Sequence, residues 1–105
     1  MSMEWTKRQE GDWTVLKIMG VINIETATEL KDLFDKTLSD GTLKVRLNLK
    51  QVPISNSSGI GHMLMLFKSL KERDGQLEIR GVSRNLLEML KLLKVDELLP
   101  VMEEE

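Results

Sequence analysis

Two kinds of side chain in this sequence could do chemistry: the serines of the stretch Ser55–Gly59, which reads S-N-S-S-G, and the lone histidine, His62. A serine near a histidine suggests a nucleophile with its general base, but a hydrolytic site also needs a group that orients the histidine. The sequence offers no such group. A zinc site is equally unsupported, because there is no cysteine and no second histidine. We therefore predict no enzymatic activity, metal or cofactor, and a solvated His62.

The glycines of this region do not form a nucleotide site. Gly59 and Gly61 match neither the G-x-G-x-x-G fingerprint nor a P-loop with its lysine. The net charge of −2 creates no overall field that would attract nucleic acid or an anionic membrane. Basic residues on the expected strands are interrupted by Asn48 and Glu78, with no interleaved aromatic platform. We therefore expect no nucleic-acid partner.

Length and composition favour one small domain inside the cell. A chain of 105 residues can close one hydrophobic core, so we expect a single domain over residues 1–105, with the acidic end 103–105 frayed. No stretch approaches the roughly 20 apolar residues of a membrane span. Residues 1–5 lack the basic start and apolar run of a secretory signal. We expect a cytoplasmic protein that does not insert into membranes.

The elements before the serine-rich stretch are predicted to be a hairpin, a helix and a strand. Strands near residues 3–8 and 13–22 flank a turn at Gly11-Asp12, with Trp5 and Trp13 packing across the hairpin or at the core edge. A helix follows over residues 26–40, with Thr26 and Glu29 as a capping-box pair. The next strand, residues 43–50, alternates apolar and polar residues, which predicts one buried face: Leu43, Val45, Leu47 and Leu49.

A second helix follows the serine-rich stretch and ends at Asp74-Gly75. Its predicted core face is Ile60, Met63, Leu64, Phe67 and Leu70. A strand over residues 77–81 leads to a third helix that Ser83 caps, with Leu86, Met89, Leu90 and Leu93 facing the core. A short strand at 98–102 completes the chain.

This element order, ββαβαβαβ, predicts an α/β fold. The opening hairpin is antiparallel, and each helix that joins two strands implies parallel neighbours, so the sheet is mixed. Two strands have a polar face, which places the helices mainly on one side of the sheet. On that arrangement Met65 lies away from the buried side of its helix and presents an apolar side chain to solvent, which is typical of adaptable interfaces.

The segment from Val45 to Gly61 resembles the hallmark of the STAS domain, a module of sulfate transporters and bacterial anti-sigma factor antagonists. In that family a strand V-x-L-x-L runs into D-S-S-G-[LI]-G at a helix start. Three further stretches are similar: Gly20-Val-Ile-Asn23, the entry from Gly75 to Leu77, and the helix text from Ser83 to Leu93. Together they span nearly the whole chain in the family's order.

The resemblance implies a bacterial signalling protein that regulates transcription by partner switching. Ser57 would be phosphorylated by a serine kinase that doubles as an anti-sigma factor, a serine phosphatase would reverse the reaction, and the unphosphorylated form, a monomer or weak homodimer, would bind the kinase. The implied contact residues, with Met65 added from its exposure, are Asn23, Ser55, Asn56, Ser57, Ser58, Gly59, Gly61 and Met65.

Elementary electrostatics agrees with a phosphate at this place, since a helix N-terminus offers free N–H groups and the positive end of the helix dipole. The alternative is that Ser57 or Ser58 is an ordinary N-cap. The sequence departs from the family at Asn23 and Asn56, where antagonists usually carry aspartate, and the family's last helix has no counterpart before Glu105. Other possible functions are a STAS subunit on a membrane transporter's cytoplasmic ATPase, a small-molecule or nucleotide-binding module, and a structural subunit of a signalling assembly.

Overall fold

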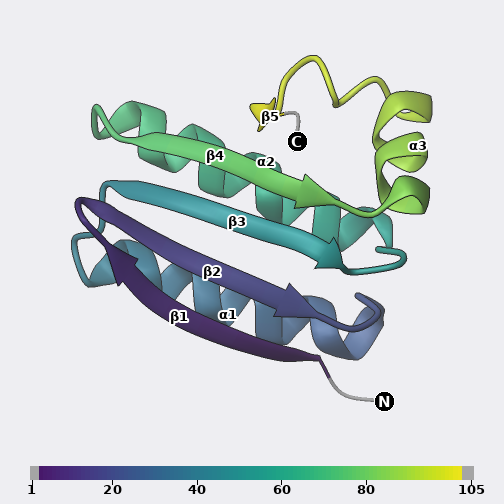
Figure 1. Cartoon of the computed structure of the whole chain (residues 1–105), viewed down its shortest axis with the longest axis horizontal. Helices are drawn as coiled ribbons and strands as arrows, with labels where there is room; N and C mark the ends of the chain where they lie inside the picture. The colour runs from purple at the N-terminus through teal and green to yellow at the C-terminus, as the bar shows by residue number, and fades with distance from the viewer. Residues whose placement is uncertain (1–2, 103–105) are drawn as a thin grey trace.

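The computed structural model describes residues 3–102; the predicted frayed end at 103–105 lies outside them. The described chain has the predicted order of elements (Figure 1). They are β1 (Glu4–Glu10), β2 (Trp13–Met19), α1 (Ile24–Ser39), β3 (Lys44–Gln51), α2 (Ser57–Glu72), β4 (Gln76–Val82), α3 (Arg84–Leu92) and β5 (Val101–Met102). The last strand is shorter than the predicted 98–102.

The strands form one mixed sheet in the order β1-β2-β3-β4-β5. β1 and β2 are antiparallel around the Gly11-Asp12 turn, and each later pair is parallel. Figure 1 shows α1 and α2 behind the sheet and α3 at the end where β4 finishes. The predicted fold class, a mixed sheet with helices mainly on one face, is therefore confirmed.

The core lies between the sheet and the two covering helices. Alternate residues of β3 and β4 point into it, as the period-two pattern predicts: Val45, Leu47, Leu49, Leu77 and Ile79. Leu43 is an exception and is exposed, because β3 begins one residue later. On α2, Ile60, Met63 and Leu70 are buried as predicted, whereas Leu66 replaces Leu64 and Phe67, which are only partly buried. Leu93 is exposed because it is the C-cap of α3.

The predicted capping box of α1 is wrong by one turn. The helix begins at Ile24, and its N-cap is Asn23, whose side chain accepts hydrogen bonds from the N–H groups of Glu25 and Thr26, each at 3.0 Å. The Thr26 hydroxyl accepts from the Asn23 N–H at 2.8 Å, so Thr26 is the third helical residue and not the cap. Asparagine is the stronger N-cap residue, which explains why the helix starts there.

The uncovered face of the sheet is polar and internally paired. Glu78 accepts hydrogen bonds from Arg80 at 2.9 Å and from Arg46 at 3.0 Å. Partial burial alone would raise the pKa of Glu78, but these bonds outweigh it and lower that pKa. The Arg46 guanidinium also lies 4.5 Å from the centre of the Trp13 ring. Trp5 pairs with Ile18 and Trp13 with Glu10, so the two tryptophans are not cross-strand neighbours, and Trp5 is 46% exposed.

Candidate functional site

The serine-rich stretch follows β3 and is tied to the segment that follows β2. An isolated parallel bridge joins Ile22 and Ser55. The Ile22 N–H donates to the Ile54 carbonyl at 3.0 Å, and the Asn56 N–H donates to the Ile22 carbonyl at 2.9 Å. These bonds hold the starts of α1 and α2 side by side, so Asn23 and Asn56 share one end of the sheet.

Asn56 is the N-cap of α2, and its side chain accepts from the Gly59 N–H at 2.8 Å. Neither Ser57 nor Ser58 is therefore the cap, and that alternative for the two serines is wrong. Ser57 is the first helical residue, and both serine side chains are exposed. Because the first N–H groups of a helix have no intrahelical acceptor, Ser57 presents its hydroxyl where an anion would be favoured.

Two of the predicted contact residues lie beneath this surface. Ser55 is 1% exposed, and its hydroxyl donates to the Asn56 carbonyl at 2.9 Å. Gly59 is buried against Ser55 and Ile22, with no room for a β-carbon. Both residues shape the loop from inside. A β-carbon on Gly61, by contrast, would meet nothing within 4 Å.

Three helix N-termini meet at this end of the molecule, because α1, α2 and α3 each follow a strand that runs in the same direction (right-hand side of Figure 1). Their caps are the uncharged Asn23, Asn56 and Ser83. The Ser83 hydroxyl donates to the Val52 carbonyl at 2.6 Å, which anchors α3 beside the end of β3. All three helices thus begin at the same end of the sheet, each with the positive end of its dipole there.

Exposed apolar side chains adjoin these caps. Ile24 is 85% exposed next to Asn23, and Ile54 is 52% exposed one residue before Ser55. Neither isoleucine was predicted from the sequence; the available signal was an apolar residue within two positions of each cap, beyond the strand that precedes it. Met65, predicted to be solvent-facing, is 58% exposed.

A groove of about 190 Å³ runs between α1 and α2. Met65 lines it together with Phe34, Leu38 and His62. His62 is half-buried in this groove, so its prediction as solvated surface is wrong, because α1 packs beside that side of α2. The part of α2 that lines this groove, which includes His62 and Met65, begins one helical turn after Ser57 and Ser58.

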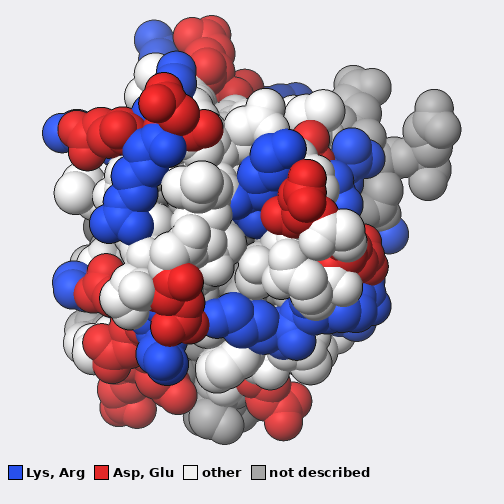
Figure 2. Space-filling view, turned by 90° about the vertical axis from the view of Figure 1, so that its left-hand side faces the viewer, with Lys and Arg blue, Asp and Glu red and all other residues white. Residues whose placement is uncertain are grey.

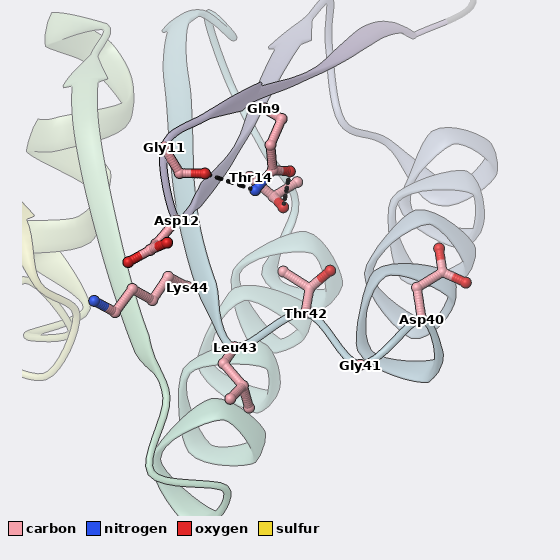
Figure 3. A pocket seen from close by; sticks show the side chains of 9 residues that line it. All are labelled: Gln9, Gly11, Asp12, Thr14, Asp40, Gly41, Thr42, Leu43 and Lys44. Carbon is pink, nitrogen blue, oxygen red and sulfur yellow. Dashed lines mark hydrogen bonds between the residues drawn. The ribbon is translucent and has the colours of Figure 1, made fainter.

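The surface is also hollowed at the opposite end of the molecule. A shallow hollow there is lined by the turn after β1 and the loop before β3 (Figure 3). Its polar groups bond to one another: Thr14 donates to Gln9 at 2.9 Å, and Gln9 donates to the Gly11 carbonyl at 3.2 Å. Basic and acidic side chains are intermixed over this end (Figure 2). Within residues 3–102, no group of three or more His, Cys, Asp or Glu could hold a metal ion.

The helices of the described chain are all too short or too polar to span a membrane. A mixed sheet with an opening hairpin, and a serine exposed at the start of the helix after the third strand, is the architecture of a STAS-type domain. The chain belongs to that family: the model described as "Mlab, STAS domain" matches residues 5–100.

Several proteins that resemble this chain in sequence or in structure are named anti-sigma factor antagonists. The anti-sigma-B factor antagonist of Staphylococcus aureus is 28% identical over 88 residues, 84% of this chain and 82% of that protein. An anti-sigma factor antagonist from Mycobacterium paratuberculosis has the same fold, with a TM-score of 0.85 at 15% identity over 94% of this chain and 84% of the other. Bacillus SpoIIAA in its phosphorylated form matches with a TM-score of 0.75 at 12% identity, covering 97% and 91%.

Proposed function

We propose that this chain is an anti-sigma factor antagonist, a regulator without catalytic activity that binds an anti-sigma factor. The observation that carries the proposal is Ser57: it is exposed as the first residue of α2, which Asn56 caps, and it follows the exposed Ile54 by three residues. The name of the S. aureus relative supports the same function.

The proposed switch is phosphorylation of Ser57. A phosphate adds a charge of about −1.5 to −2. At the start of α2 this charge would face the free N–H groups and the positive end of that helix's dipole, so the fold should tolerate it. In a complex, the same charge would be forced against an apolar contact that includes Ile24 and Ile54. Burying an unpaired charge is costly, so the phosphate should release the partner.

The proposed binding surface comprises the exposed members of the predicted set and the two isoleucines beside them. Its residues are Asn23, Ile24, Ile54, Asn56, Ser57, Ser58, Gly61 and Met65. The kinase would be the anti-sigma factor itself, and a serine phosphatase would restore binding. We further propose that residues 1–105 act as one cytoplasmic domain that needs no cofactor and binds no nucleic acid.

The test of the switch is phosphorylation in vitro by the serine-kinase anti-sigma factor of the same organism. Mass spectrometry should place the phosphate on Ser57. Ser57→Ala should abolish incorporation, whereas the matched control Ser58→Ala should retain it. Incorporation at Ser58, or none into the parent chain, would refute the proposed switch.

A second candidate is a STAS subunit of a membrane transporter assembly. The observation that favours it is the uncharged pair Asn23 and Asn56, which cap α1 and α2 where the antagonists of this family usually carry aspartate. In this case the same surface would hold a transporter's cytoplasmic ATPase without a phosphate switch. Co-purification with that ATPase, undisturbed by Ser57→Asp, would favour this candidate over the first.

A further inference from the structure

β1 is an open edge of the sheet. Among residues 3–102 it pairs only with β2, and Figure 1 shows no described element beyond it. All seven of its residues are exposed, in contrast to the mostly buried or half-buried residues of β2. In an antiparallel pair, alternate residues direct their N–H and C=O groups away from the partner strand. β1 therefore presents a row of unpaired backbone groups that another strand could use.

Only some registers allow β1 to pair with β1 of a second copy. The backbone groups that point away from β2 belong to every second residue of β1. Hydrogen bonds between two copies therefore form only when odd-numbered residues lie opposite odd-numbered residues and even-numbered residues lie opposite even-numbered ones. Such a pairing also puts the uncovered faces of the two sheets on the same side of the dimer. The reason is that directly opposed residues point their side chains to the same face of a sheet. The symmetric registers that remain are centred on Trp5, Thr6, Lys7, Arg8 or Gln9.

Charge separates these registers. Centring on Lys7 opposes Lys7 with its copy and Glu4 with Glu10, and centring on Arg8 opposes two arginines. Like charges directly opposite one another destabilise a sheet. The registers centred on Trp5 and Gln9 leave much of one end of the strand unpaired. The register centred on Thr6 opposes Glu4 with Arg8 twice and Trp5 with Lys7 twice, so each charged side chain among the paired residues 4–8 meets a favourable neighbour.

We propose that this protein forms a homodimer through antiparallel pairing of two β1 strands in the Thr6-centred register. The side of β1 that faces α1 supports a second copy of the chain as the partner. Trp5 and Lys7 line a groove of about 500 Å³ between β1 and α1, with Leu33 at its base. In the dimer the partner's indole lies opposite Lys7 and covers the mouth of this groove. The sheet becomes continuous across both copies.

The dimer is a weak one. A single pair of short strands buries much less than the roughly 1,600 Å² of a standard protein interface. β2 separates β1 from β3, the strand that precedes Ser57, so Ser57 takes no part in the proposed pairing. This inference is therefore independent of the proposed function, and either can fail alone.

Charge reversal tests both the interface and its register. We would measure the dissociation constant of the full chain by sedimentation equilibrium at concentrations up to about 1 mM. Glu4→Arg and Arg8→Glu should each weaken the dimer by about tenfold or more, because each creates two like-charge pairs. The double variant restores opposite charges and should return the constant to within a few-fold of the parent. Arg84→Glu on α3, at the other side of the sheet, is the matched control and should change nothing.

Circular dichroism of each variant would exclude loss of fold as the cause of dissociation. A parent chain that stays monomeric over the whole concentration range would overturn the proposal. So would a dimer that both single reversals leave intact, since it would use another surface. Single reversals that dissociate the dimer without rescue in the double variant would overturn the register.

Discussion

The hydroxyl oxygen of Ser55 occupies the space that a β-carbon on residue 59 would need. The Cγ2 methyl of Ile22 closes the same space from the other side, 2.6 Å from that position. The first turn of α2 can therefore lie against the segment after β2 only because residue 59 is glycine. This contact sets the position of Ser57, two residues earlier.

We predict that Gly59→Ala destabilises the protein by about 1–3 kcal/mol, the usual cost of an overpacked core. Gly61→Ala is the matched control in the same helix. A methyl group there meets nothing within 4 Å, so the substitution should stabilise the protein by about 0.5–1 kcal/mol. Urea denaturation of both variants measures the difference. Equal effects at the two positions would contradict the close packing of Gly59.

The cap of α2 predicts a different pair of results. Asn56→Ala removes the acceptor for the Gly59 N–H and should cost about 1 kcal/mol of stability. Asn56→Asp keeps an acceptor and adds negative charge at the positive end of the helix, so it should be neutral or slightly stabilising. Thermal unfolding of the two variants tests this. An unchanged stability in Asn56→Ala would show that the cap is not needed, and a loss with aspartate as large as with alanine would contradict the favourable effect of negative charge at this helix start.

The arginine pairs of Glu78 predict a pH dependence. Because its folded pKa is lowered, ionised Glu78 contributes stability above its ordinary value of 4.5, and that contribution is lost as the pH falls through the lower folded value. Glu78→Gln should thus destabilise the protein at about pH 7 and have little effect at about pH 3. The difference should vanish when Arg46 and Arg80 are both changed to glutamine. An effect that does not vary with pH would contradict the role of these pairs.

Met65→Glu tests the extent of the proposed binding surface. The side chain is 58% exposed, so stability should change by less than about 0.5 kcal/mol. Affinity for the anti-sigma factor should fall by about tenfold or more, because a carboxylate would be buried in an apolar contact. Leu92→Glu, at an exposed leucine of α3, is the control and should leave affinity unchanged. Unchanged affinity in both variants would show that the binding surface does not extend from the Ser55–Gly59 loop to Met65.

The parts of the fold that could be predicted are those with a regular pattern. β3 and β4 alternate apolar and polar residues because one face of the sheet is covered, so their register in the core follows from the sequence. The start of α1 could not be fixed in the same way. Asn23 and Thr26 can both serve as caps, asparagine more readily than threonine. The bonds that distinguish their positions, among them those from the Glu25 and Thr26 N–H groups to the Asn23 side chain, exist only in the folded backbone.

The site was predictable only in outline. The text S-N-S-S-G identifies a helix start but does not say which side chain is the cap, because asparagine and serine serve equally well. The burial of Ser55 depends on the bridge to Ile22, a residue 33 positions earlier in the chain. The exposure of every β1 residue also depends on tertiary structure, namely the absence of a strand beyond β1 among the described residues.

The proposed function depends most on the charge at Ser57. The direct measurement is a calorimetric titration of the parent, Ser57→Ala and Ser57→Asp with the anti-sigma factor, with thermal melts of the three proteins alongside. Ser57→Asp should weaken binding on the order of a hundredfold, while its melting temperature stays close to that of the parent. Ser57→Ala should bind like the parent. Equal affinities for all three proteins would contradict the account, as would an aspartate variant that does not fold.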